Sequence, residues 1–296
     1  MGVSALLLAA AALVGPGPGD LTPREKSALV VVSGLPAPKG VAGVIVRSYD
    51  REAPRPPGAL VFVDQEGAFA NAFGDLPPFR TASSYTATGE AFAAGRAAGR
   101  ALRREGVHVD LAPVLDLAGG PLGSRHFARP RFGVAFARGL ERGGVAACPK
   151  HFPGLGTAAV STDESPHVPA RPLEREVRGF RQAIRAGVGC IMVSHAFYEG
   201  ARRRRASFSR SAYRMLRRLG FEGVAITDSV SVFGSPEAVR SAVKAVKAGA
   251  DLVLFTNGRD AARAIRALVP LARRGFLDER VERVLELRRN LGLSRP

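Results

Sequence analysis

Two short stretches of this 296-residue chain carry side chains suited to acid–base and nucleophilic chemistry. Lys150 and His151 directly follow the apolar residues 145–149, and Asp228 follows the apolar residues 223–227. Charged or titratable residues at the end of a buried strand are typical of a site that the scaffold holds in place. One basic and one acidic strand end together predict an enzyme active site on an α/β scaffold.

The scaffold is predicted from strand-like and helix-like segments that alternate along the chain. Near-continuous apolar runs indicate strands buried on both faces, and the amphipathic stretches between them indicate helices. Eight repeats predict a single-domain TIM-type (β/α)8 barrel; an open doubly wound sheet competes, but no Gly-x-Gly-x-x-Gly turn follows the first strand. The runs are residues 30–32, 44–46, 60–63, 109–114, 146–150, 190–193, 224–226 and 252–255, and the clearest helical stretches are 89–105, 173–186, 209–219 and 236–248.

Other predicted strands also end in polar residues. Asp64 follows the third run, Asp116 lies just past the fourth, His195 follows the sixth, and Thr256-Asn257 follow the eighth. In a barrel, the residues that follow the strands point into one mouth. We therefore expect these side chains to surround a single cleft, with His195 in a structural role at its edge and with His108 and His126 outside the chemistry.

The composition limits the possible partners. Hydrophobic residues make up 46% of the chain, which allows a full core over one domain, residues 20–296. The net charge of +17 suggests a nucleic-acid partner, but the arginines are spread along the predicted helices. The dense cluster 202–205 lies in a predicted loop, without a zinc-finger or RNA-binding signature. We expect no nucleic-acid binding; an anionic cell surface fits the charge better.

The chain has two cysteines, Cys148 and Cys190, and each lies inside an apolar run. Their spacing matches no metal site, and an isolated cysteine in a core behaves as a small buried hydrophobe. We therefore expect two reduced core thiols.

Residues 1–19 form a separate N-terminal extension. Its apolar residues 5–14 have the length of a signal-peptide core and are too few to span a bilayer, and Gly and Pro alternate over residues 15–19. No Lys or Arg precedes the apolar run, and the cysteine of a lipid-anchor signal is missing. A signal remnant or weak export signal is the favoured interpretation, and a disordered or helical extension is the alternative. We expect an exported or cell-envelope location in preference to the cytoplasm, without a stable membrane span.

Six segments, taken in order, resemble glycoside hydrolase family 3, particularly its single-barrel β-N-acetylglucosaminidases. Val63-Asp64-Gln65-Glu66-Gly67 resembles the Asp-Gln-Glu-Gly segment of that family, and Lys150 to Gly154 is its Lys-His-Phe-Pro-Gly motif. Each segment alone is a weak signal, but their combination and order are specific. The remaining similar segments are residues 21–26, 111–116, 124–127 and 219–228.

The resemblance implies retaining glycoside hydrolysis of cell-wall-type saccharides that contain N-acetylglucosamine. Asp228 would be the nucleophile, and an acid/base group would protonate the leaving oxygen and then activate water. Asp64, Arg125, Lys150 and His151 would bind the sugar hydroxyls. We also expect a monomer that needs no metal ion and no organic cofactor.

The loop after Gly154 departs from the family pattern. In the β-N-acetylglucosaminidases it contains His-Gly and then Asp-Ser-His, whose His is the acid/base. Here Leu155 replaces the first His, and Ser165-Pro166-His167 ends a longer loop. His167 and Asp163 are therefore both candidates for the acid. A sugar-binding Arg is also missing, because residues 68–70 read Ala-Phe-Ala. The alternative function is a catalytically degenerate barrel that binds sugar or an envelope partner.

Overall fold

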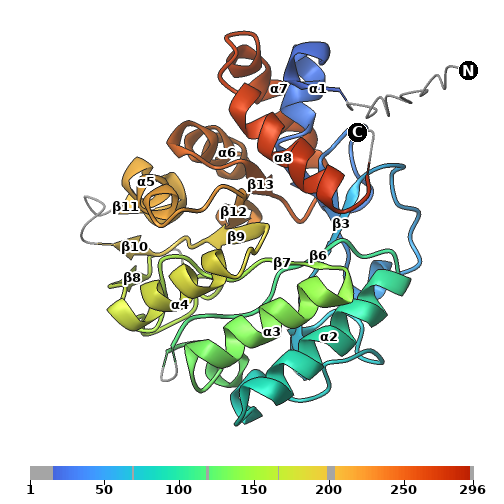
Figure 1. The fold of residues 1–296 in the computed structure, drawn as a ribbon. Helices are drawn as coiled ribbons and strands as arrows, with labels where there is room; N and C mark the ends of the chain where they lie inside the picture. Colours follow the sequence, from blue (N-terminus) through green and yellow to red (C-terminus); the bar gives the residue numbers. More distant parts are fainter. Residues whose placement is uncertain (1–15, 69, 118–119, 166, 199–203, 294–296) are drawn as a thin grey trace, which may run out of the picture.

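The chain folds into a parallel β-barrel enclosed by helices. The computed structural model describes residues 16–68, 70–117, 120–165, 167–198 and 204–293. In these residues an eight-stranded sheet has the order β7-β6-β3-β2-β1-β13-β12-β9, and Figure 1 shows helices surrounding it. The predicted TIM-type barrel is confirmed. Its strands are β1 (Val31–Ser33), β2 (Gly43–Ile45), β3 (Leu60–Val63), β6 (Val109–Asp110), β7 (Ala146–Ala147), β9 (Cys190–Val193), β12 (Val224–Ser229) and β13 (Leu252–Leu254).

The helices pack on the outside of the barrel and follow the predicted amphipathic stretches. The four clearest stretches correspond to α2, α4, α5 and α6, with ends that differ by at most one residue from those expected. Short 3-10 turns, including η6 (Ala206–Phe208) and η7 (Val230–Phe233), link the strands to the helices. The α-helices are α1 (Pro23–Ala28), α2 (Thr88–Arg104), α3 (Pro130–Gly143), α4 (Glu174–Arg185), α5 (Arg210–Arg218), α6 (Glu237–Ala248), α7 (Gly258–Ala272) and α8 (Asp278–Asn290).

Alternation along each strand explains why the runs are apolar on both faces. Val32 and Phe62 belong to the cluster that fills the barrel, together with Met192 and Leu254. The residues that precede these four point outward and pack in the larger cluster beneath the helices. Each strand therefore contributes to two cores, which favours β-branched and other apolar residues at consecutive positions.

The two ends of the sheet, β7 and β9, meet at a seam of irregular backbone. Met192 N–H donates to Pro149 O (3.0 Å), and Phe152 N–H donates to Met192 O (2.8 Å). Inside the barrel a disulfide joins Cys148 to Cys190 across this seam. The expectation of two reduced thiols was wrong, because strands that are 42 residues apart in the sequence become neighbours when the barrel closes.

Two smaller sheets follow the barrel strands. A two-stranded antiparallel ribbon comes directly after β3 and consists of β4 (Gln65–Gly67) and β5 (Ala70–Asn71). A second sheet joins β8 (Pro169–Ala170), β10 (Phe197–Tyr198) and β11 (Arg204–Arg205). These additions extend the loops that follow strands β3, β7 and β9.

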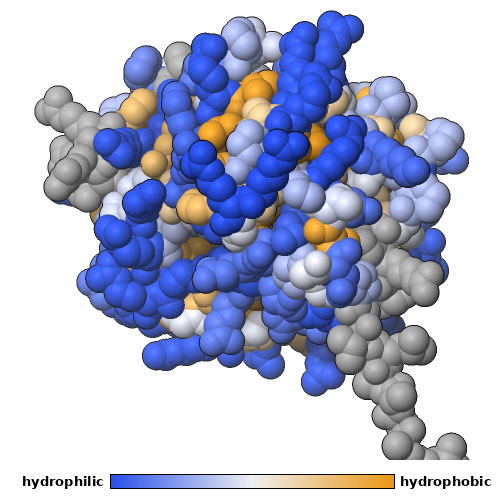
Figure 2. Space-filling model, turned by 90° about the horizontal axis from the view of Figure 1, so that it is seen from above, coloured by the Kyte–Doolittle hydropathy of each residue, from blue (hydrophilic) through white to orange (hydrophobic). Residues whose placement is uncertain are grey.

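The surface in Figure 2 is mostly hydrophilic, with scattered apolar patches. Among the described helices, none has both the length and the apolar character required to cross a membrane. Most of the predicted extension, residues 1–15, lies outside the described residues, as do Arg202 and Arg203 of the basic cluster.

The disulfide yields a test on the denatured protein. Protein purified without reductant and unfolded in guanidinium with iodoacetamide should take up no alkyl group, because both of its cysteines are bonded to each other. Reduction before alkylation should label both. Mass spectrometry of the intact chain distinguishes these states, and alkylation of either cysteine without reduction would contradict the disulfide.

Candidate active site

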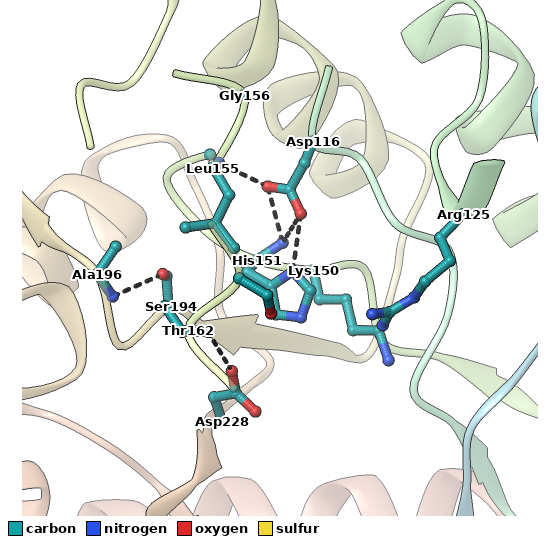
Figure 3. Close-up of polar contacts among 12 residues, drawn as sticks. Asp116, Arg125, Lys150, His151, Leu155, Gly156, Thr162, Ser194, Ala196 and Asp228 are labelled. Atoms are coloured by element: carbon teal, nitrogen blue, oxygen red, sulfur yellow. Dashed lines mark hydrogen bonds and ion pairs between the residues drawn. The ribbon is translucent and has the colours of Figure 1, made fainter. Parts of the chain in front are cut away.

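A cavity of about 280 Å³ opens at the carboxyl ends of the barrel strands. It brings together residues from the ends of β2, β3, β7, β12 and β13 and from the loops between them. Six of the seven residues predicted for the site line this cavity: Asp64, Arg125, Lys150, His151, Asp163 and Asp228. Figure 3 shows His151, Lys150 and Arg125 on one side and Asp228 facing them from the end of its strand.

Glu66 is the centre of a buried charge cluster in the cavity wall. Arg125 donates to both of its carboxylate oxygens, from Nε and Nη2, at 2.8 Å each. Lys150 Nζ lies 2.7 Å from Glu66 Oε1 and donates to Asp64 Oδ1 at 2.5 Å. The side chains of Lys150 and Glu66 are each only 3% exposed, whereas Asp64 is 43% exposed and open to a ligand. The cluster fixes two cations at the cavity wall.

The charges in this cluster stabilise one another. Burial raises the pKa of Glu66, but Lys150 and Arg125 lower it by more, so that it lies at about 2 instead of the usual 4.5. Burial lowers the pKa of Lys150, and Asp64 and Glu66 outweigh this effect and raise it above its usual value. Glu66 and Lys150 are therefore ionised at neutral pH, which suits fixed hydrogen bonding to sugar hydroxyls.

Alternation along the chain after β3 explains why Asp64 and Glu66 act together. Side chains two residues apart in an extended segment point to the same side. Gln65 points to the other side, where its Nε2 donates to Phe73 O (3.0 Å) and Phe73 N–H donates back to Gln65 Oε1 (2.9 Å). Sequence reasoning assigned no role to Glu66; its two-residue spacing from Asp64 was the signal that could have found it.

Asp116 orients His151. Its Oδ2 lies 2.7 Å from His151 Nδ1, and its Oδ1 accepts from Leu155 N–H at 2.8 Å (Figure 3). Because a carboxylate only accepts, Nδ1 is the nitrogen that donates to Asp116, which leaves Nε2 directed away from Asp116. Asp116 was predicted only as a strand-end residue; its contact with His151 depends on the neighbouring positions of β6 and β7.

Asp228 lies near the end of β12, where the backbone fixes its carboxylate. Ser229 N–H donates to Oδ1 (2.7 Å), and Thr162 Oγ1 lies 3.5 Å from Oδ2. Burial raises the pKa of Asp228, but His151, His195 and the Ser229 N–H, with Lys150, lower it by more. The pKa of Asp228 therefore lies below its usual value, and its carboxylate is ionised at neutral pH.

The loop after Gly154 places Asp163 at the cavity. Glu176 of α4 holds the start of this loop: its Oε1 accepts from Gly156 N–H (2.6 Å) and Leu117 N–H (3.3 Å). Thr162 is buried, whereas Asp163 lines the cavity. Asp163 as a whole is exposed, but partial desolvation of its carboxyl group and the nearby Asp228 carboxylate raise its pKa, and His151, Arg125 and Lys150 only partly oppose them.

His167 lies away from this cavity. It is exposed, its ring stacks on Phe197 of β10 at a centroid distance of 5.5 Å, and it is not among the described residues that line the cavity. In the Asp-Ser-His pattern one residue separates the Asp from the His, whereas three residues, 164–166, separate Asp163 from His167. The structure therefore brings Asp163, and not His167, to Asp228.

The family of the chain follows from its match to a family model. The model described as the N-terminal domain of glycosyl hydrolase family 3 matches residues 44–287. The chain belongs to this family and is a β-glycoside hydrolase, as the sequence predicted.

Curated and solved relatives agree with this assignment. A β-hexosaminidase from Methylobacillus flagellatus is 32% identical over 267 residues, which cover 77% of this chain and 76% of the relative. A β-N-acetylhexosaminidase structure from Beutenbergia cavernae has a TM-score of 0.80 at 25% identity, covering 91% of this chain and 99% of that one. A family 3 β-N-acetylglucosaminidase from Paenibacillus sp. str. FPU-7 has a TM-score of 0.81 at 25% identity; 93% of this chain matches 64% of the longer relative.

The lowered pKa of Glu66 predicts how stability depends on pH. A carboxylate whose pKa falls on folding stabilises the protein above its unfolded pKa, and this stabilisation is lost as pH falls toward the folded value. The change from 4.5 to about 2 corresponds to about 3 kcal/mol. Glu66→Gln should therefore be much less stable than the wild type at pH 7, and the gap should narrow as pH falls from about 4.5 to about 2.

Chemical denaturation at several pH values measures the difference in the free energy of unfolding between the wild type and Glu66→Gln. Glu174→Gln is the matched control, because Glu174 is exposed and its pair with Arg178 is long, at 3.7 Å. The control should follow the wild type throughout. A stability gap for Glu66→Gln that stays constant with pH would show that the carboxylate charge is not what stabilises the site.

Proposed function

We propose that this protein is a retaining β-N-acetylglucosaminidase in which Asp228 is the nucleophile and Asp163 is the acid/base. The observation that carries the proposal is the pair of carboxyl groups at one cavity with pKa values shifted in opposite directions. Such a pair provides one group that is ionised for attack and one that keeps a proton for the leaving group. The hexosaminidase relatives supply the sugar class.

The reaction has two steps. In the first, an Asp228 carboxylate oxygen bonds to the anomeric carbon while the glycosidic C–O bond breaks, and the Asp163 proton passes to the leaving oxygen. In the second, Asp163 takes a proton from water, whose oxygen attacks the same carbon and releases Asp228. Both carboxyl groups end in their starting protonation states.

The remaining cavity residues bind the sugar. Lys150 and Arg125 present charged donors that Glu66 holds in place, and Asp64 is the accessible acceptor for a hydroxyl pair. His151, oriented by Asp116, faces the sugar with its other ring nitrogen. Because these donors are fixed before the substrate arrives, little ordering is needed on binding.

Asp228→Asn tests the nucleophile. The amide keeps the size of the carboxylate but cannot form the glycosyl-enzyme, so kcat on an aryl N-acetylglucosaminide should fall by roughly 10³-fold or more. Binding of N-acetylglucosamine, measured by calorimetry, should remain. Turnover at the wild-type rate would remove Asp228 from the mechanism.

Asp163→Ala tests the acid through the choice of leaving group. A dinitrophenolate departs with little protonation, whereas a sugar hydroxyl requires an acid. The substitution should therefore lower kcat/KM on a chitooligosaccharide by about 10²- to 10⁴-fold and affect glycosylation by a dinitrophenyl glycoside far less. Azide, a nucleophile that needs no base, should restore turnover of the aryl substrate and give the β-glycosyl azide.

The pH profile gives a second readout. Because Asp163 acts in its protonated form, activity should decline as pH rises through its raised pKa, and the alanine variant should lack this decline. His167→Ala is the matched control and should retain both substrates, since its ring lies on Phe197. Selective loss of chitooligosaccharide cleavage in His167→Ala would instead make His167 the acid. A wild type that cleaves neither substrate would favour the non-catalytic sugar-binding barrel.

A further inference from the structure

His195 is a buried imidazole close to the nucleophile that the proposed mechanism does not use. It follows β9 and is only 1% exposed. Its ring packs against Phe233 and Phe208, at centroid distances of 4.8 and 5.8 Å. Phe233 ends the 3-10 turn η7, which begins directly after β12. The ring is therefore packed against the segment that carries Asp228.

Both the ring and the main chain of His195 are held in place. Nδ1 lies 2.7 Å from Ser207 Oγ, and His195 O accepts from Arg205 Nη1 at 3.0 Å. Ser207 is itself fixed, because its N–H donates to Ser194 O (2.9 Å) and its carbonyl accepts from Tyr213 OH (3.0 Å). These contacts fix the orientation of the ring.

The other ring nitrogen is free to support the strand that carries the nucleophile. Nε2 is buried and has no hydrogen-bond partner among the described residues. The main chain of Asp228 and Ser229 is close enough to the His195 ring to raise its pKa, against the larger lowering by burial. Burial lowers the pKa of His195, so the ring is neutral at neutral pH and carries one N–H. When the Ser207 hydroxyl donates to Nδ1, the single N–H proton of the His195 ring lies on Nε2.

We infer that His195 is a positioning residue for Asp228, whose Nε2–H holds the end of β12 so that the carboxylate points at the anomeric carbon. This role rests on the proposed function, in which Asp228 is the nucleophile. His195 is not among the described residues that line the cavity, so it acts on the carboxylate through the strand and not on the sugar. From the other directions Asp228 is faced by Lys150 and His151 after β7, and by Thr162 and Asp163 from the loop.

Two substitutions separate positioning from packing. His195→Phe keeps an aromatic ring between Phe208 and Phe233 but has no N–H. His195→Gln loses the ring but can place an amide N–H near the position of Nε2. If the ring matters only as packing, phenylalanine is the milder change; if the N–H matters, glutamine is milder. Unfolding midpoints measured for both variants report the packing contribution separately.

The kinetic test uses an aryl N-acetylglucosaminide. His195→Phe should lower kcat by about 10- to 100-fold, the range for loss of a supporting hydrogen bond, with KM within about threefold of wild type. His195→Gln should retain a kcat at least about fivefold above that of the phenylalanine variant. Ser207→Ala no longer fixes the tautomer of the His195 ring, and its kcat should lie between those of the wild type and His195→Phe. A kcat ranking that follows only the unfolding midpoints would overturn the inference.

A second measurement does not depend on turnover. Titration of 13C-labelled aspartate by NMR, with Asp228→Asn to assign the signal, gives the pKa of Asp228 in each variant. Both substitutions remove the imidazole, whose charge when it is protonated lowers the pKa of Asp228, so both should raise this pKa. The amide N–H of glutamine should make the rise smaller in His195→Gln than in His195→Phe. Equal rises in the two variants would contradict the positioning role, even if the wild type proved to hydrolyse no glycoside. Loss of wild-type hydrolysis with the expected shift would instead refute only the proposed reaction.

Discussion

The site depends on one buried carboxylate, Glu66, which neutralises two cations at the barrel mouth. Without it, Lys150 and Arg125 would lie next to each other with Asp64 as their remaining carboxylate, and burying an unpaired charge costs several kcal/mol. Glu66 lies in the ribbon after β3, Arg125 in the loop after β6 and Lys150 after β7, so their geometry exists only when these strands are assembled in the barrel. The same burial that makes the cluster costly to assemble also makes its hydrogen bonds strong and fixed, which is what recognition of sugar hydroxyls requires.

This positive wall gives the two catalytic candidates different properties. Asp228 lies among His151, His195 and the Ser229 N–H, and its pKa is lowered although burial of its carboxyl group opposes this. Asp163 approaches on a loop, where burial and the Asp228 charge raise its pKa. One carboxyl group is thus suited to attack and the other to proton donation, although both are aspartates. The position of Asp163 depends on the fold through Glu176 of α4, whose carboxylate holds the start of the loop that carries Asp163.

The barrel could be predicted from the sequence because its strands are buried on both faces, which leaves runs such as residues 60–63 and 224–226 apolar at every position. The cavity-lining residues could be located for a related reason: Asp64, Lys150 and Asp228 each stand where such a run stops. Contacts between distant segments could not be predicted from such runs. The Cys148–Cys190 disulfide and the Asp116–His151 pair depend on which strands become neighbours, and the position of His167 depends on how a lengthened loop packs against Phe197.

The central claim is that Asp228 forms a covalent bond to the sugar, and trapping that bond tests it most directly. A 5-fluoro-N-acetylglucosaminyl fluoride has a leaving group that needs little acid assistance, and its ring fluorine slows breakdown of the glycosyl-enzyme. Peptide mass spectrometry after incubation should find the sugar on Asp228, and Asp228→Asn should remain unlabelled. A sugar attached to Asp163 or to any other residue, or time-dependent inactivation without a covalent adduct, would contradict the account.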